Sequence, residues 1–172
     1  GRVVFVRGGI PGDLATIEVV DERRDWARAV ITSVEAASPQ RGTPTCPARG
    51  AGCGGCDWAE ILPQHQLELK AGIVVEALRR TAKMDHEPEI GASVTRNGYR
   101  SGVRVIGTAD HRAGFRRAAE DTSVPAGRCE IAVPVLAEML ESITVDPGLE
   151  VTLRASVATG EVTARWDDRL GN

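Results

Sequence analysis

Four cysteines constrain this 172-residue chain more than any other feature of its sequence. Cys46, Cys53 and Cys56 have the spacing C-x6-C-x2-C, and Cys129 follows 73 residues after the last of them. The two-residue gap lets two thiolates of one turn face a common metal centre, and the glycines between them free backbone N–H groups to point at sulfur. The pattern predicts a metal centre that joins two distant segments of the chain.

Four thiolates suit either a tetrahedral zinc ion or an iron–sulfur cluster. Structural zinc sites commonly pair two C-x2-C turns, whereas this chain has one, Cys53-Gly54-Gly55-Cys56. Three clustered ligands and one distant ligand fit the corners of a [4Fe–4S] cubane better, so the spacing favours the cluster and keeps zinc as the alternative. Disulfides are less favoured because nothing in the sequence is typical of secretion, and the ligand-like spacing makes ordinary reduced cysteines less favoured as well.

The composition is that of an ordinary globular protein, with 42% hydrophobic residues, 26% charged residues and a formal net charge of −3. It excludes a mainly disordered, collagen-like or coiled-coil chain. The longest apolar run, Val3–Val6, is far shorter than the roughly 20 residues that cross a bilayer. We therefore expect a cytoplasmic monomer without membrane association.

The first forty residues have the pattern of short strands. Three strands are predicted over residues 2–7, 14–20 and 26–34, and their spacing of about ten residues is typical of a small barrel or part of one. A linker rich in Pro and Gly follows at 38–44. Three strands do not close a barrel by themselves.

Beyond the cysteine string the sequence pattern predicts both helices and strands. Residues 63–82 are predicted to form a helix, whose apolar stripe of Leu67, Ala71, Val74 and Leu78 is expected to pack in the core. The later elements are predicted as strands over 99–108 and 115–118, a helix over 134–143 and a hairpin over 149–158 and 161–166. The expected class is α+β.

Positive charge is concentrated in one stretch. Residues 96–117 contain six arginines and a single acid, in a chain that is acidic as a whole. Alternation along a strand places Arg100 and Arg104 on one face, with Val103 and Val105 on the other. Arginines with interleaved rings favour contact with single-stranded or looped RNA, and the alternative is a solvated strand face with Phe115 in the core. The predicted RNA-binding residues are Arg96, Tyr99, Arg100, Arg104, Phe115, Arg116 and Arg117.

The cysteine string 46–56, the Gln66-Leu67-x-x-Lys70 helix start and the lone Cys129 resemble RNA (uracil-5-)-methyltransferases. Members of this family that carry a cluster have an N-terminal TRAM domain, which is a small OB-like RNA-binding barrel. A central domain with a [4Fe–4S] cluster follows, and then a methyltransferase domain that uses S-adenosylmethionine. The resemblance covers nearly the whole chain. It implies a partial TRAM-like barrel at 1–40 and a central domain of antiparallel sheet with flanking helices at 41–172.

The same resemblance makes Cys46, Cys53, Cys56 and Cys129 the cluster ligands. Family chemistry needs a further Cys to attack C6 of uracil, and it needs a Gly-rich turn between a strand and a helix to hold the cofactor. The sequence offers neither, so we expect no catalytic and no S-adenosylmethionine-binding residue in this chain. It is expected to be an inactive portion of a longer enzyme, with rRNA or tRNA as partner.

Two other functions are compatible with the cysteines. The first is a stand-alone RNA-binding adaptor with a structural zinc or iron–sulfur site. The second is a redox or radical enzyme, which the x6 gap disfavours and which would leave one iron without a Cys ligand. A fourth ligand at Cys129 favours a closed, structural cluster.

Overall fold

The computed structural model describes residues 1–92, 95–118 and 120–166. These residues form two compact units, each built from two segments of the chain. Unit 1 comprises Gly1–Thr43 and Asp57–Gly91, and unit 2 comprises Pro44–Cys56 together with the chain from Ala92 onward. The predicted boundary between residues 40 and 41 stays a prediction, because compactness alone does not define functional modules.

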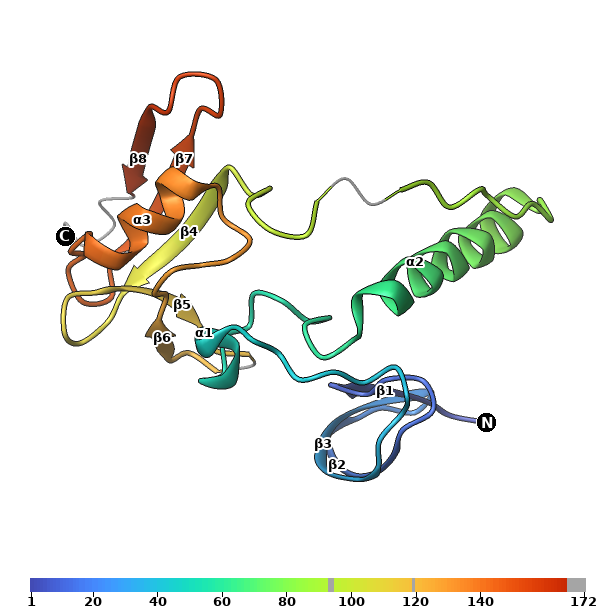
Figure 1. The fold of residues 1–172 in the computed structure, drawn as a ribbon. Coiled ribbons are helices and arrows are strands. Elements are labelled where there is room, and N and C mark those ends of the chain that lie inside the picture. Colours follow the sequence, from blue (N-terminus) through green and yellow to red (C-terminus); the bar gives the residue numbers. More distant parts are fainter. Residues whose placement is uncertain (93–94, 119, 167–172) are drawn as a thin grey trace. The chain divides into compact units, whose positions relative to one another are not determined.

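Unit 1 begins with a three-stranded mixed sheet (Figure 1). Its strands are β1 (Val3–Arg7), β2 (Leu14–Glu22) and β3 (Trp26–Ala36). The central strand β3 pairs in parallel with β1 and antiparallel with β2. The three predicted strands are thus confirmed. Within the described residues they form an open sheet and not a closed barrel, so the OB-like character of this segment stays a prediction.

The helix of unit 1 confirms one expectation and corrects another. It runs as α2 (Pro63–Ala77) and continues as the π-helical turn η1 (Leu78–Ala82). The apolar stripe was expected in the core, but no residue of α2 is buried, and Ile73 and Val74 are 58% and 47% exposed. The prediction was wrong because a helical period shows which residues share a face and does not show whether another element covers that face.

The start of α2 is held by the segment that precedes it. The Gln66 side-chain amide donates to the carbonyls of Trp58 (3.1 Å) and Ile61 (3.0 Å). The Lys70 ammonium lies 5.7 Å from the centre of the Trp58 ring, a cation–π contact. Gln66 and Lys70, which the family resemblance singled out, therefore both anchor this helix.

Unit 2 contains a five-stranded antiparallel sheet in the order β6-β5-β4-β7-β8. The strands are β4 (Gly102–Gly107), β5 (Ala113–Arg116), β6 (Ser123–Pro125), β7 (Glu150–Ala155) and β8 (Val162–Trp166). The α+β class and the C-terminal hairpin are confirmed. The short strand β6 and a four-residue helix, α1 (Pro47–Gly50), were not predicted, because both are too short to show a period.

One face of this sheet carries the core of unit 2. The helix α3 (Pro134–Ser142) packs against β7 (Figure 1). Its Leu136 and Leu140 are buried among inward-facing residues of β4 and β7. Leu136 and Leu153 are completely buried, and Val105 is 1% exposed. The apolar alternation of β4 and β7 thus faces α3, which leaves the other face of the sheet to polar side chains.

The described residues contain no helix with both the length and the apolar character that crossing a lipid bilayer requires.

Candidate metal centre and arginine surface

The cysteine loop, residues 46–56, is held in shape by its own backbone. Cys46 precedes α1, and Pro47 occupies the first turn of that helix, where its missing N–H costs nothing. The chain then turns back, and the Cys53 N–H donates to the Ala48 carbonyl at 2.8 Å. This turn brings Cys53 close to the start of the loop.

The cysteine loop pairs with the chain that leaves β5. The Gly54 N–H donates to the Arg116 carbonyl at 3.0 Å, and the Ala118 N–H donates to the Gly52 carbonyl at 3.1 Å. Gly52 has a φ of +101°, and a Cβ at Gly54 would lie 3.2 Å from backbone atoms of Ala118. The two glycines therefore permit an approach that larger residues would obstruct.

All four cysteines lie in unit 2 with free thiols. Cys53 is buried, and the other three are partly exposed. Burial raises the pKa of Cys53, and the thiols of Cys46 and Cys129 raise it further. The Gly55 N–H, whose nitrogen lies 3.4 Å from the Cys53 sulfur, lowers this pKa. Burial also raises the pKa of Cys56, as do the other three thiols, while Arg100 lowers it. The thiols of Cys46 and Cys129 thus lie near enough to Cys53 and Cys56 to raise their pKa.

The thiols are not arranged around a single bound ion. Among the residues that the structure describes, no three His, Cys, Asp or Glu side chains stand together as ready ligands for a metal ion. The donor set nevertheless has the chemistry of a thiolate centre, with four sulfurs and apolar cover from Ala48, Val124 and Phe115. The metal centre stays a prediction.

A hollow of about 850 Å³ lies beside Cys129 in unit 2. Its wall includes Pro47 and Ala48 from α1 and Pro134 and Ala137 from α3. Arg128, also in the wall, pairs with Glu141 at 3.2 Å. This hollow could not be predicted from the sequence, because its wall comes from segments some eighty residues apart.

The predicted RNA-binding residues divide into two groups. Arg100 lies near Cys56, and Arg117 extends over Gly52 of the cysteine loop. Arg104 and Arg116 instead meet at one carboxylate of β7, since Glu150 lies 3.9 Å from the first and 2.7 Å from the second. Arg104 and Arg116 therefore meet at Glu150, whereas Arg100 and Arg117 lie beside the cysteine loop.

The two predicted rings also differ in their surroundings. Tyr99 is 55% exposed just before β4, whereas Phe115 packs against the buried residues of unit 2. Arg96 is exposed in the same segment as Tyr99. Packing is the alternative role that the sequence left open for Phe115, and RNA contact by all seven residues stays a prediction.

Strand pairing adds two arginines that lie outside the predicted stretch. Arg104 on β4 is opposite Thr152 on β7, which is opposite Arg165 on β8. Arg154 on β7 is opposite Gly102, and its side-chain Cγ would lie 3.6 Å from a Cβ at that glycine. Only the register across β4, β7 and β8 shows that these arginines share a face.

No protein-family model matches the chain. An uncharacterized RNA methyltransferase of Corynebacterium efficiens is 37% identical over 98% of this chain, and one of Aquifex aeolicus is 33% identical over 83%. A 23S rRNA (uracil(1939)-C(5))-methyltransferase of a Shewanella strain is 28% identical over 81%. These alignments cover 39%, 34% and 32% of the relatives, so the chain spans less than two fifths of their length.

The resemblance predicted from the cysteines, the helix start and the first strands is therefore confirmed by similarity along nearly the whole chain. The chain belongs to the family of RNA methyltransferases that includes the 23S rRNA uracil-C5 enzymes.

Proposed function

We propose that this chain is the RNA-binding and cluster-holding portion of an S-adenosylmethionine-dependent RNA methyltransferase that forms 5-methyluridine in rRNA or tRNA. The observation that carries the proposal is the similarity to named RNA methyltransferases over 98% of the chain, together with coverage of only 39% of the relative's length. In this proposal the remaining part of the enzyme binds S-adenosylmethionine and carries out methyl transfer. The first three strands belong to a TRAM-like module.

The proposed ligands of a [4Fe–4S] cluster are Cys46, Cys53, Cys56 and Cys129. Two features of unit 2 support the assignment: neighbouring thiols raise the pKa of Cys53 and of Cys56, and apolar residues cover Cys53, the most buried of the four. Bound there, the cluster would supply a rigid cross-link between the cysteine loop and Cys129, a role suited to a small domain with few large core residues. Zinc is the alternative occupant of the same four thiols.

Metal analysis tests the assignment directly. The full chain is purified without oxygen, and its iron, acid-labile sulfide and zinc are measured per chain. We expect about four iron and four sulfide. Cys53→Ser should lose them, whereas Thr45→Ala, one residue before Cys46, should keep them. One equivalent of zinc without iron or sulfide would replace the cluster with a zinc site, and an absence of both metals would contradict a metal centre.

RNA binding and methyl transfer test the remainder of the proposal. The chain should bind 23S rRNA fragments in a gel-shift titration, because arginines and an exposed ring provide phosphate and base contacts. It should transfer no methyl group from S-adenosylmethionine, since the four thiols serve as ligands and none remains to attack uracil. Methylation of RNA by this chain alone would contradict the assignment as an accessory portion.

A further inference from the structure

The five-stranded sheet of unit 2 has one face that α3 does not cover. Residues directly opposite one another in paired strands point to the same side of a sheet. The pairs Arg104–Thr152, Thr152–Arg165 and Arg154–Thr163 therefore all lie on the side away from Val105 and Leu153. We call Arg104, Arg154, Arg165, Thr152 and Thr163 the arginine face; its three arginines and Thr163 are exposed, and Thr152 is partly buried.

The arginine face carries a surplus of positive charge. Its arginines are exposed, with the Arg104 side chain 73% accessible. Glu150 is an acid on this side, and it lies 2.7 Å from Arg116 and 3.9 Å from Arg104. In the part of the chain that the structure describes, neither Arg154 nor Arg165 forms an ion pair. Among the described residues, the Arg154 and Arg165 guanidinium groups therefore stand beside two threonine hydroxyls without an acidic partner, whereas Arg104 shares Glu150 with Arg116.

Among its described residues, the arginine face has no aromatic ring that could stack on a nucleobase. Trp166 is opposite Val151, and Phe115 is opposite Val124, so both rings belong to the side of the sheet that carries the core. Guanidinium and hydroxyl groups suit the oxygens of a phosphodiester chain, whereas base recognition needs stacking or contacts to base edges. The arginine face therefore suits contacts with the backbone of a nucleic acid and does not suit recognition of its base sequence.

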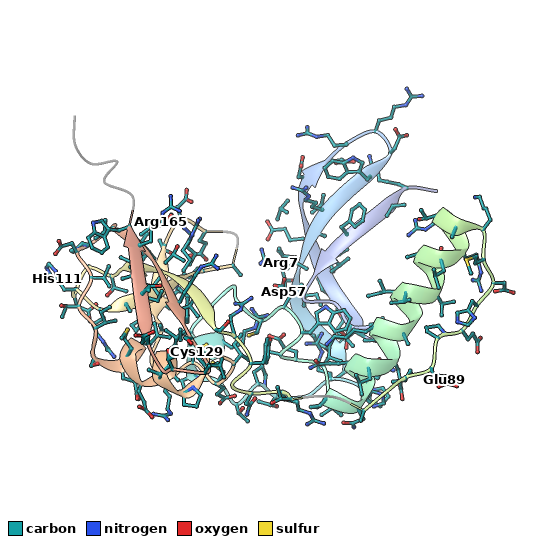
Figure 2. The ribbon with its side chains drawn as sticks, turned by 90° about the horizontal axis from the view of Figure 1, so that it is seen from above. Arg7, Asp57, Glu89, His111, Cys129 and Arg165 are labelled. Atoms are coloured by element: carbon teal, nitrogen blue, oxygen red, sulfur yellow. The ribbon has the colours of Figure 1, made fainter. Side chains whose placement is uncertain are left out.

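The face is separate from the cysteine centre. Figure 2 shows Arg165 on β8 and Cys129 in a different part of unit 2. A ligand on the arginine face would therefore not need the thiols or a bound metal, and the two sites can be tested independently.

We propose that the arginine face binds the phosphate backbone of the RNA substrate and positions it, with Arg154 and Arg165 as contacts additional to Arg104. This inference rests on the proposed function as part of an RNA methyltransferase. Each arginine neutralises a phosphate and releases a counterion, so binding through this face weakens as salt increases. The contacts are insensitive to RNA sequence.

The experiment compares two double variants of the full chain that remove the same charge. Arg154→Gln with Arg165→Gln alters the arginine face, and Arg79→Gln with Arg128→Gln removes two exposed arginines elsewhere, both of them in ion pairs. The dissociation constant for oligouridylate and for a mixed-sequence RNA of equal length is measured at several salt concentrations. Thermal unfolding and metal content verify that each variant is folded.

The arginine-face variant should bind both RNAs roughly tenfold more weakly, and the slope of log K against log salt should become less steep by about 1.4, or 0.7 for each lost contact on a single strand. The control variant should retain both values within about twofold. Equal losses in the two variants, or no change in the first, would overturn the inference while leaving the proposed function intact. A wild-type chain that binds neither RNA would instead contradict the proposed function.

Discussion

The Asp13 carboxylate accepts hydrogen bonds from the Nε and Nη2 atoms of the Arg41 guanidinium, and the Asp13 side chain is only 4% exposed. The same carboxylate accepts the backbone N–H groups of Ile10 (2.8 Å) and Ser38 (2.9 Å). Arg41 also donates to the Gly8 carbonyl at 2.7 Å. One ion pair thus fastens the turn between β1 and β2 to the chain that leaves β3.

Asp13→Ala should destabilise unit 1. The substitution leaves two backbone N–H groups without their acceptor and leaves the half-buried Arg41 without its counter-ion. A loss of about 2–4 kcal/mol in the free energy of unfolding is expected from breaking such a pair. Urea denaturation followed by circular dichroism measures it. A change below about 0.5 kcal/mol, typical of an exposed site, would contradict the structural role of this pair.

Acid should weaken the same pair. Hydrogen bonding from Arg41 is the main cause that holds the pKa of Asp13 well below its ordinary value, and burial opposes it. The unfolded chain therefore takes up this proton at higher pH than the folded chain. The stabilisation is fully present above about pH 4 and declines as the pH falls below it toward the folded pKa. Asp13→Asn, which does not titrate, should show a smaller loss of stability than the wild type between about pH 4 and pH 2.

The two long helices should differ in their sensitivity to truncation. Leu136→Ala in α3 removes a completely buried side chain and should cost about 2–5 kcal/mol of unfolding free energy. Val74→Ala in α2 alters a side chain that is 47% exposed, and its effect should stay within about 0.5 kcal/mol. Chemical denaturation of both variants checks the contrast. A large effect of Val74→Ala would show that another part of the protein covers α2.

The position of the cysteine loop should depend on Gly54. A Cβ there would press against backbone atoms of Ala118 and the Arg116 carbonyl, so Gly54→Ala should displace the loop from β5. Gly50→Ala is the matched control, because a Cβ at Gly50 meets nothing within 4 Å. In metal-free protein, Gly54→Ala should speed alkylation of the buried Cys53, and Gly50→Ala should not. Equal rates in both variants would mean that the loop does not need this close approach.

Cys129 should be required for the metal centre. Cys129→Ala removes the one thiol that lies outside the cysteine loop, so it should reduce the bound iron and lower the unfolding temperature of the purified protein. Loss of redox turnover with unchanged stability would instead favour a redox enzyme. Val135→Ala, a partly buried change in the adjacent helix, controls for ordinary loss of packing.

Local pattern alone predicted much of unit 2. The repeat of apolar and polar residues in β4 placed Val103 and Val105 on one face and Arg104 on the other, and in the structure the two valines are buried and the arginine is exposed. Alternation of this kind depends only on the two-residue period of a strand. The cysteine spacing likewise marked four residues as candidate metal ligands, because thiols at such spacing serve metal centres far more readily than packing. The metal centre itself stays a prediction.

The strand neighbours, the register and the burial of each face depend on pairing between segments that are distant in the sequence. The sequence places Arg104, Arg154 and Arg165 in predicted strands, but it does not show which strands are neighbours or in which register. In the same way, the apolar stripe of α2 showed which residues share one face of the helix, but it did not show whether another element buries that face. Periodicity is a property of a few consecutive residues and can be derived from sequence. Register and burial arise from contacts between segments some fifty residues apart, so only the tertiary structure could place three arginines side by side.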